Sequence, residues 1–416
     1  MDRIITRPLR SGKIRAIPSK SAAHRLLICA QMSSLDIKGV CDGLSEDLAA
    51  TTECLRKIGE ASRGGIDPSS VEDAVAEEAE DEVILNCRES GSTLRFLLPL
   101  CAAMGQPAYL RGSERLMKRP LAELEEQLTA HGCRITRTPQ GIRIRGKLCG
   151  GRYDLPGTVS SQYISGLMFV LPLLDEDSEI CIDGMLQSRP YVDMTIDALK
   201  KSGISIEECE TGDAVIYRIR GGQRYGLKTF AIEDVEGDWS NGAFWLAAAE
   251  LGADIECTGL DPGSLQGDRN ILNMIEECRA TGEIEIDVGQ TPDLVPVIAI
   301  LAMARDAEDV TRIVNAGRLR MKESDRIESV VAAVNALGGC AKARETEIII
   351  TGTGDRKLDP SGPVDSYNDH RIVMMAAIGA LLCEGPVEIR GSQAVRKSYP
   401  GFFDDYVRLG GEVRSI

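Results

Sequence analysis

The chain lacks the features that mark secreted and membrane-spanning proteins. Its first residues, Met1 to Ile5, contain no hydrophobic signal segment, so we expect a cytoplasmic protein. The longest apolar run, from Ile372 to Leu382, is well short of the ~20 residues that span a bilayer. The 13 cysteines are scattered and include no Cys-x-x-Cys pair, which argues against a disulfide framework and fits a reducing compartment.

Histidine is scarce, and the 48 basic residues are outnumbered by 64 acidic ones. The three histidines, His24, His131 and His370, lie far apart in the sequence and show no metal-ligand spacing, so we expect no metal site. The net charge of -16 argues against nonspecific binding to nucleic acid or to an anionic membrane, because the average field repels both. A cluster of cations in this background therefore indicates a site for a small anion.

The sequence does contain enough apolar material for two domains. Its 416 residues are too many for one ordinary core, and 43% of them are apolar. Helical segments recur that end in a hydrophobic-x-x-x-Gly stop, roughly 70 residues apart, and each stop predicts a left-handed C-terminal cap. The stops are Leu55 to Gly59, Leu128 to Gly132, Leu199 to Gly203, Val334 to Gly338 and Tyr406 to Gly410, with a weaker sixth member in Asp268 to Gly282. Six similar units are implied.

A second kind of helix precedes each stop. It has a polar or proline-marked start and a mostly apolar body, which predicts burial on nearly all sides. The starts are Ser19-Lys20-Ser21, Ser90-Gly91-Ser92, Val159-Ser160-Ser161-Gln162, Asp238-Trp239-Ser240, Thr291-Pro292-Asp293 and Asn368-Asp369-His370-Arg371. Between the helices, alternating apolar and polar residues predict strand pairs with one exposed face. Examples are 134–137 with 142–145, and 204–206 with 215–219.

Six units divide most simply into three plus three. The glycine-rich stretch from Gly221 to Gly226 follows the third unit and predicts the break. The first strand, Asp2 to Ile17, could pair with either half. The acidic segment from Glu72 to Glu82 is typical of a solvated helix or loop, and we assign it no chemistry.

The first polar start indicates half of a phosphate site. Ser19 or Ser21 can cap the helix, so that the helix dipole and the Lys20 ammonium face one anion. Ser21 and Arg25 are four residues apart and share one helix face, so both can reach a single ligand. The alternative interpretation is an ordinary capped surface helix.

Cationic residues recur at or near the other starts. If the buried helices of each half run parallel, their positive ends converge and two such faces form a cationic cleft. Lys322 and Arg326 are four apart and can point the same way, with Glu323 close enough to move protons. Asp293 is either an N-cap or a base whose pKa the cations lower. A solvated charged face is the alternative for each residue taken singly. The other cations are Arg95, Arg119, the run 318–326, His370-Arg371 and Lys397.

Together these motifs closely resemble the 3-phosphoshikimate 1-carboxyvinyltransferase, or EPSP synthase, family of enolpyruvyl transferases. The resemblance extends from Lys20 to Lys397, and the order and spacing of its motifs are more specific than any single one. The motifs are Ser19-Lys20-Ser21 with Arg25, Gly91 followed by Arg95, Lys118-Arg119-Pro120, Val159-Ser160-Ser161-Gln162, Ser188-Arg189-Pro190-Tyr191, Lys322-Glu323-Ser324-Asp325-Arg326, Asp369-His370-Arg371 and Lys397-Ser398-Tyr399-Pro400.

The resemblance implies an α/β (α+β) fold of two similar domains. Each domain has three βαβαββ repeats with helices enclosed by sheets, an inside-out α/β barrel. We expect an N-terminal domain over residues 19–226 and a discontinuous C-terminal domain over residues 1–18 and 227–416. The first strand belongs with the C-terminal half, and the domains close on the first substrate.

The implied reaction moves the enolpyruvyl group of phosphoenolpyruvate to the 5-hydroxyl of shikimate 3-phosphate, by addition and elimination through a tetrahedral intermediate. It is a step of chorismate and aromatic amino-acid biosynthesis, needs no metal or other cofactor, and is the target of glyphosate. We expect a monomer. The implied catalytic residues are Asp293, Lys20, Glu323 and His370, and sequence alone leaves open whether Lys20 or Glu323 serves the methylene carbon. Shikimate 3-phosphate is held by Lys20, Ser21, Arg25, Ser160, Ser161, Gln162, Ser188, Asp293 and Lys322. Phosphoenolpyruvate is held by Lys20, Gly91, Arg119, Gln162, Arg326, Arg371 and Lys397.

The chain departs from the usual family pattern at a few positions. The glycine that commonly precedes the Ser19-Lys20-Ser21 motif is missing, and Glu89 adds a carboxylate near the expected phosphoenolpyruvate pocket. Arg318 stands where a smaller polar residue is common. Gly91 keeps the small residue of glyphosate-sensitive members, so we expect inhibition by glyphosate.

Two other functions compete with this interpretation. The related enzyme acting on UDP-N-acetylglucosamine usually has a reactive cysteine five residues before its Arg-Pro pair, where this chain has Glu114. A non-enzymatic clamp built from repeats around nucleic acid predicts positive charge overall, against the observed -16.

Overall fold

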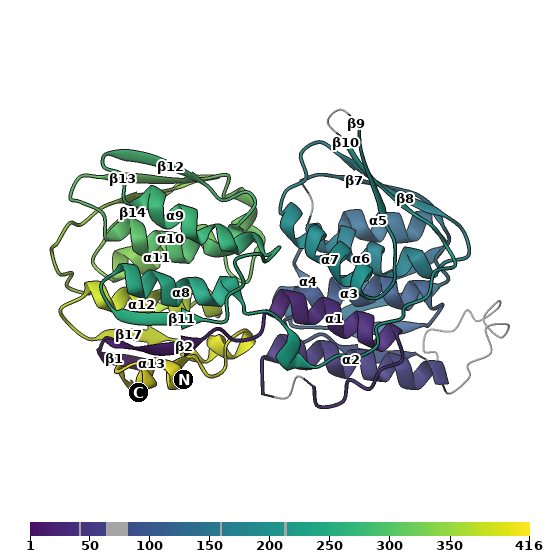
Figure 1. Ribbon diagram of the computed structural model, residues 1–416, viewed down its shortest axis with the longest axis horizontal. Helices are drawn as coiled ribbons and strands as arrows, with labels where there is room; N and C mark the ends of the chain where they lie inside the picture. Colours follow the sequence, from purple (N-terminus) through teal and green to yellow (C-terminus); the bar gives the residue numbers. More distant parts are fainter. Residues whose placement is uncertain (41–42, 64–81, 159, 212–213) are drawn as a thin grey trace. The chain divides into compact units, whose positions relative to one another are not determined.

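The structure, a computed structural model, describes residues 1–40, 43–63, 82–158, 160–211 and 214–416 (Figure 1). The chain divides into two compact units: Lys20–Asp234, the N-terminal unit, and Met1–Ser19 with Val235–Ile416, the C-terminal unit. The acidic segment 72–82 lies outside the described residues except for Glu82, and Val159 also lies outside them.

Both unit boundaries differ from the expected ones. Ser19 belongs to the C-terminal unit instead of opening the N-terminal one, and residues 227–234 belong to the N-terminal unit. The glycine-rich stretch expected to form the break is held on that unit. The amide of Gly226 donates to the carbonyl of Ser202 at 2.8 Å, and the amide of Leu227 donates to the Ser33 hydroxyl at 2.9 Å.

The N-terminal unit contains two four-stranded sheets and their helices. Its elements are α1 (Lys20–Met32), α2 (Glu46–Arg63), β3 (Val83–Asn86), α3 (Gly91–Ala103), β4 (Ala108–Arg111), α4 (Glu114–Met117), α5 (Ala122–Ala130), β5 (Cys133–Thr138), β6 (Gly141–Gly146), β7 (Gly151–Pro156), α6 (Ser161–Val170), β8 (Ser178–Asp183), α7 (Arg189–Lys201), β9 (Glu207–Thr211) and β10 (Ala214–Ile219). The sheet orders are β3-β4-β6-β5 and β7-β8-β10-β9, each with one parallel pair followed by antiparallel pairs.

The C-terminal unit combines the first residues of the chain with its second half. Its elements are β1 (Arg3–Arg7), β2 (Ser11–Arg15), α8 (Trp239–Glu250), β11 (Asp254–Thr258), α9 (Ile271–Cys278), β12 (Glu283–Asp287), α10 (Val295–Met303), β13 (Val310–Val314), α11 (Arg326–Ala336), β14 (Cys340–Ala343), β15 (Ile348–Thr351), β16 (Val364–Asp365), α12 (His370–Gly379), β17 (Val387–Arg390), α13 (Phe402–Arg408) and β18 (Glu412–Ser415). The sheet orders are β12-β13-β15-β14, β16-β17-β1-β18 and the parallel pair β11-β2. Figure 1 shows α9, α10, α11 and α12 lying between β12 and β13 on one side and β1, β2 and β17 on the other.

The predicted βαβαββ repeat is confirmed in four of the six units. Three sheets follow it in chain order, and in the fourth β1 supplies the last strand by pairing antiparallel with both β17 and β18. The other two units have fewer strands among the described residues. The α8 and α9 repeat has only the β2–β11 pair, and the α1 and α2 repeat has no strand among the described residues.

The predicted enclosed helix bodies are confirmed for α3, α6, α10 and α12, whereas α1 and α8 are only partly buried. Every residue of α10 and α12 is buried, and in α3 and α6 only Ser92 and Gln162, both in the first turn, are partly exposed. Ser90, Ser160, Asp238 and Asp369 cap α3, α6, α8 and α12 through their side chains. Among the described helices, none is both long enough and apolar enough to cross a membrane.

Four of the six predicted glycine stops are confirmed. Gly132, Gly203, Gly338 and Gly410 directly follow the C-cap residue of a helix and have φ between 81° and 98°, the left-handed conformation of a C-terminal cap. Gly282 is also left-handed, but α9 ends at Cys278, and the Gly282 amide donates to Asp309 Oδ1 at 2.6 Å, so it does not cap that helix. Gly59 instead lies inside α2, which continues to Arg63. A Cβ at Gly59 would lie 2.4 Å from Nε2 of Gln31, so this glycine provides space between α1 and α2 and does not end a helix.

One of the two predicted strand pairs begins later than expected. Residues 134–137 pair with 142–145 as predicted, with Arg134 opposite Arg145. Residues 204–206 are not a strand, and β9 starts at Glu207. The amides of Gly203 and Ile204 donate to the carbonyls of Lys200 and Leu199, so the buried Ile204 completes a Schellman cap of α7 before the strand begins.

Candidate functional site

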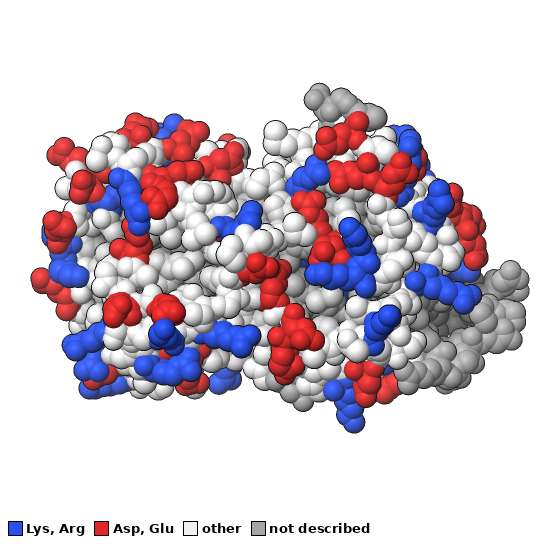
Figure 2. Space-filling model, viewed as in Figure 1, with Lys and Arg blue, Asp and Glu red and all other residues white. Residues whose placement is uncertain are grey.

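Burial separates two groups of cationic residues. On the face shown in Figure 2, basic and acidic side chains are interspersed, as expected for a solvated surface. The cations at the helix starts are different, because they are enclosed. The exposed fractions are 3% for Arg25, 5% for Arg95, 0% for Arg326, 4% for Arg371 and 7% for Lys397. The interpretation of these residues as an ordinary solvated face is therefore wrong.

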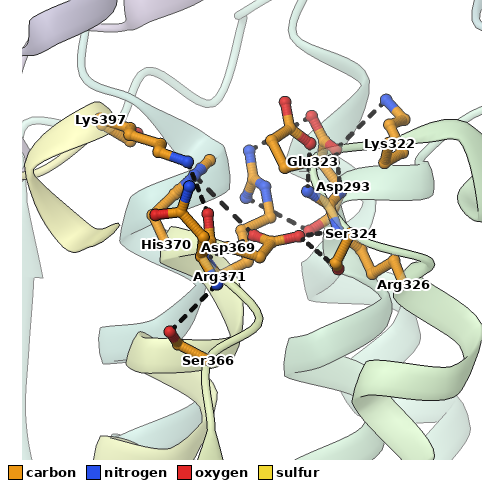
Figure 3. Close-up of polar contacts among 12 residues, drawn as sticks. Asp293, Lys322, Glu323, Ser324, Arg326, Ser366, Asp369, His370, Arg371 and Lys397 are labelled. Carbon is orange, nitrogen blue, oxygen red and sulfur yellow. Dashed lines mark hydrogen bonds and ion pairs between the residues drawn. The ribbon is translucent and has the colours of Figure 1, made fainter. Parts of the chain in front are cut away.

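In the C-terminal unit, the helix starts converge on the carboxylate of Asp293 (Figure 3). Arg326 Nη1 lies 2.7 Å and Lys322 Nζ 3.4 Å from Oδ1, and Arg371 Nη2 lies 3.2 Å from Oδ2. Burial alone would raise the pKa of Asp293, but the three cations outweigh burial and hold the pKa well below its usual range. Asp293 is not an N-cap, because it lies in the 3₁₀ turn Pro292–Leu294 that precedes α10.

Arg326 contacts three carboxylates at once. Besides Asp293, it donates through Nη2 to Glu323 at 2.7 Å and through Nε to Asp369 at 3.0 Å. Burial by itself would lower the pKa of Arg326. The three carboxylates outweigh this effect and raise the pKa above its already high value, so the guanidinium stays charged. Asp369 is itself fully buried, caps α12 through Oδ1, and accepts a hydrogen bond from Ser324 through Oδ2 at 3.1 Å. The orientation of Arg326 is thus fixed by buried partners.

Lys322 and Arg326 point to the same group, the Asp293 carboxylate, but not for the predicted reason. They do not share a helix face: α11 begins at Arg326 with Asp325 as its N-cap, and Lys322 follows the 3₁₀ turn Gly317–Met321 in an extended conformation. Burial and the charge of Arg326 lower the pKa of Lys322, while Asp293 opposes this shift. The two cations meet at Asp293 through loop geometry.

Two further predicted residues lie beside this cluster. Lys397, at the end of the 3₁₀ helix Ser392–Lys397, donates to the backbone carbonyl of Asn368 at 2.6 Å. His370 opens α12, is 2% exposed, and has Nδ1 3.9 Å from Asp369 Oδ1. The structure therefore brings Asp293, Lys322, Glu323, Arg326, His370, Arg371 and Lys397 together in the C-terminal unit (Figure 3).

A buried acid that the sequence did not single out lies beside this cluster. Asp268, in the 3₁₀ turn Gly267–Asn270, is 4% exposed. Burial and the negative charge of Asp293 raise the pKa of Asp268 to about 7, against the opposing effect of Arg371. Asp268 lies in the repeat whose helix-stop pattern is the least clear of the six, and no motif or spacing in the sequence identifies it as a site residue.

In the N-terminal unit, Lys20 opens α1 and forms an ion pair with Asp47 in the first turn of α2, at 2.9 Å. Asp47 was not predicted from the sequence as part of the site. Its position in the first turn of a helix, where acidic residues are favoured, was the one sequence feature that could have indicated it. Ser19, the residue before α1, lies in the C-terminal unit. Its buried hydroxyl donates to the Oε1 atom of Gln266 at 3.0 Å, within the C-terminal unit.

Arg25 is held by the first turns of two helices. Its Nε donates to the Thr195 hydroxyl at 2.8 Å, and its two terminal nitrogens donate to the carbonyls of Ser21 and Tyr191, each at 2.7 Å. Burial lowers the pKa of Arg25 to about 10, so it remains a cation at neutral pH. Ser21 and Arg25 are therefore neighbours on α1, joined through the Ser21 backbone.

The starts of α3 and α6 form a second polar group with Arg119. Gln162 accepts from Arg95 Nη1 at 2.7 Å and donates to the Ser92 hydroxyl at 2.8 Å. A Cβ on Gly91 would lie 2.8 Å from Arg119 Nη1 and 3.1 Å from Arg95 Nη1. The two guanidinium groups thus lie against the bare α-carbon of Gly91.

The predicted serines also lie at helix starts. Ser160 caps α6 and is followed by the buried Ser161, the first residue of that helix. Ser188 precedes α7, is 3% exposed, and has the left-handed backbone conformation with φ of 56°. The N-terminal unit therefore places Lys20, Ser21, Arg25, Gly91, Arg119, Ser160, Ser161, Gln162 and Ser188 at or next to helix starts.

This architecture, two units of enclosed helices, has the fold of the enolpyruvyl transferases. The structure of the enolpyruvyl transferase NikO from Streptomyces tendae aligns with a TM-score of 0.68 at 15% identity, over 99% of this chain and 98% of that one. The EPSP synthase from Acinetobacter baumannii aligns with a TM-score of 0.74 at 21% identity, over the full length of both chains.

Sequence comparison identifies the family within the enolpyruvyl transferases. Residues 6–406 match the family described as EPSP synthase (3-phosphoshikimate 1-carboxyvinyltransferase), and the chain belongs to that family. It is 39% identical to the 3-phosphoshikimate 1-carboxyvinyltransferase of Clostridium kluyveri, over 97% of this chain and 96% of the relative. It is 38% identical to the protein of the same name in Clostridium acetobutylicum, with the same coverage.

Proposed function

We propose that this protein transfers the enolpyruvyl group of phosphoenolpyruvate to the 5-hydroxyl of shikimate 3-phosphate, releasing phosphate, as a step of aromatic amino-acid biosynthesis. The observation that carries the proposal is the gathering of Lys322, Arg326 and Arg371 around the carboxylate of Asp293 in a member of this family. Buried cations can stabilise two anionic substrates that must be brought together, and the carboxylate beside them can accept the proton that the reacting hydroxyl loses. The names of the relatives favour this reaction over that with UDP-N-acetylglucosamine.

The hydroxyl-rich helix starts are assigned to shikimate 3-phosphate. Hydroxyl groups and helix amides suit the phosphate and the hydroxyls of a cyclic acid, and Arg25 and Lys322 supply charge. The proposed contacts are Lys20, Ser21, Arg25, Ser160, Ser161, Gln162, Ser188, Asp293 and Lys322.

The guanidinium groups are assigned to phosphoenolpyruvate. Arginine binds carboxylate and phosphate through paired hydrogen bonds, which suits a small ligand that carries both groups. The bare α-carbon of Gly91 lets such a ligand approach Arg119 closely. The proposed contacts are Lys20, Gly91, Arg119, Gln162, Arg326, Arg371 and Lys397.

The chemistry proceeds by addition and then elimination. Asp293 takes the proton of the 5-hydroxyl as its oxygen bonds to C2 of phosphoenolpyruvate, and Lys20 or Glu323 gives a proton to the methylene carbon. Loss of phosphate, together with a proton from the new methyl group, then forms the enol ether. His370 completes the proposed catalytic set at the start of α12.

The low pKa of Asp293 sets a condition on this mechanism. A carboxylate that three cations hold is a weak base. When the carboxylate and phosphates of the substrates share those cations, the pKa of Asp293 rises toward its usual range. Asp293 therefore becomes an effective base only in the substrate complex.

The test is phosphate release by the purified protein. We expect release only when phosphoenolpyruvate and shikimate 3-phosphate are both present, and competition between glyphosate and phosphoenolpyruvate. UDP-N-acetylglucosamine in place of shikimate 3-phosphate is the matched control and should give no release. Activity with the sugar nucleotide, or none with shikimate 3-phosphate, would contradict the proposal.

The family resemblance also carries three expectations about the state of the protein. It works as a cytoplasmic monomer, its reaction needs no metal or other cofactor, and its two units close on shikimate 3-phosphate. Light scattering gives the oligomeric state, and turnover in the presence of a chelator tests the cofactor. A smaller radius of gyration in X-ray scattering with saturating shikimate 3-phosphate is the expected sign of closure.

A further inference from the structure

A chain of four buried polar side chains runs through the core of the N-terminal unit. His24 Nδ1 on α1 lies 2.9 Å from the Thr51 hydroxyl on α2, which lies 2.6 Å from the Thr93 hydroxyl on α3. The Thr93 hydroxyl donates to the Ser90 hydroxyl at 2.7 Å. All four residues are at most 1% exposed. Polar groups in such a core are kept where they hold a specific arrangement.

The direction of these hydrogen bonds fixes the tautomer of His24. Thr93 uses its hydroxyl proton on Ser90, so Thr51 must donate to Thr93. Thr51 then has no proton left for His24, and Nδ1 of His24 must be the donor. Nε2 of His24 is buried and has no hydrogen-bond partner among the residues that the structure describes. This agrees with a bare ring nitrogen, since a buried N–H without an acceptor is the rarer case.

The chain connects the residues that carry the proposed function. Lys20 and Asp47 lie four residues, one helical turn, before His24 and Thr51. The Lys20–Asp47 ion pair and the His24–Thr51 hydrogen bond are therefore successive links between α1 and α2. At the other end, Ser90 also accepts from the backbone amide of Thr93 and so caps α3, directly before Gly91.

We propose that His24, as the neutral Nδ1–H tautomer, is a positioning residue for phosphoenolpyruvate. Through Thr51 and Thr93 it holds the starts of α1 and α2 against the start of α3, and so sets the distance between Lys20 and Gly91. This inference rests on the proposed function. His24 does not touch the substrate.

The first test removes one link and keeps the shape. Thr51→Val replaces the hydroxyl with a methyl group, and we expect KM for phosphoenolpyruvate to rise by about tenfold, because a small displacement of a binding group is costly. Thr52→Val is the matched control. The Thr52 hydroxyl bonds only to the Leu48 carbonyl of its own helix, at 2.9 Å, and KM should stay within about twofold.

A second pair of variants keeps or removes the donor at position 24. His24→Asn keeps an N–H near the place of Nδ1, and His24→Leu removes it. The asparagine variant should be closer to the wild type in KM for phosphoenolpyruvate, with thermal unfolding checked for both. Equal KM values for Thr51→Val and Thr52→Val, or for His24→Asn and His24→Leu, in an active protein would overturn the inference.

The tautomer itself has a readout that does not depend on activity. Only three histidines are present, so ¹⁵N-histidine spectra can be assigned with the His24→Asn variant. We expect a protonated Nδ1 and a bare Nε2 for His24 at pH 7, and loss of this pattern in Thr51→Val. A protonated Nε2 in the wild type would refute the network even in an active enzyme. Absence of turnover with the expected spectrum would instead count against the proposed function.

Discussion

Two aspartates of the C-terminal unit have the same local role in different surroundings, and this gives a sharp stability prediction. Asp369 and Asp325 both cap a helix through their side chains. Asp369 is fully buried and also holds the Nε atom of Arg326 at 3.0 Å. Asp325 is only partly buried, and its ion pair with Arg320 joins side chains that are 39% and 31% exposed. Substitution of each by asparagine keeps a capping oxygen and removes the charge.

The expected losses of stability differ because of burial. Asp369→Asn places an amide nitrogen against the Nε donor of Arg326, or turns its oxygen there and gives up the cap. Breaking a buried pair in this way costs about 3–5 kcal/mol of unfolding free energy. Asp325→Asn removes a solvent-screened pair, for which about 0–1 kcal/mol is expected.

Urea unfolding followed by tryptophan fluorescence measures this difference in the right unit. The only two tryptophans, Trp239 and Trp245, both lie in α8 of the C-terminal unit. KM for phosphoenolpyruvate should rise in Asp369→Asn, since Arg326 loses its fixed orientation, and stay unchanged in Asp325→Asn. Equal losses of stability in the two variants would refute the argument that the buried network holds Arg326.

Three further predictions concern the N-terminal unit. Gly91→Ala puts a methyl group 2.8 Å from Arg119 Nη1. Because the end of the Arg119 side chain can move aside, we expect little change in melting temperature but a rise of about tenfold in KM for phosphoenolpyruvate. A large fall in melting temperature would contradict this. Burial, with the charges of Lys20 and Arg25, lowers the pKa of His24 well below its usual value. Below pH 6.5 the unfolded chain therefore binds a proton that the folded chain does not, and stability falls by up to ~1.4 kcal/mol per pH unit. His24→Asn should remove this part of the acid destabilisation, measured by circular dichroism between pH 7 and pH 5, and parallel curves would disprove it. Lys20→Met should lower kcat by at least about 10²-fold while the fold is kept, and a wild-type rate would exclude Lys20 from the mechanism.

The sequence predicted well what depends on neighbouring residues. Polar N-caps such as Ser90 and Asp369 lie where a short pattern places them, because capping involves only the next few residues. Predictions that assumed local rules where tertiary contacts decide were wrong. Gly59 continues a helix because it packs on Gln31, and Lys322 meets Arg326 through a loop.

Tertiary contacts also explain why sequence analysis missed two residues near the site. Asp268 acquires its raised pKa only through burial beside Asp293, which is 25 residues further along the chain (293 − 268). Asp47 matters only because α2 packs against α1 and brings it to Lys20. Neither relation leaves a periodicity or a spacing in the sequence.

The position of β1 determines when the protein can finish folding. This strand lies between β17 and β18, so Ile5 pairs with Val387 and with Val413. The ribosome produces β1 long before its two partners, so the C-terminal unit cannot complete this sheet until β18 has been synthesised. The N-terminal unit is continuous in sequence and can fold while the rest is being translated. An extension fused directly to Met1 is therefore expected to slow folding of the C-terminal unit. Deletion of the first seven residues removes β1, an interior strand of its sheet.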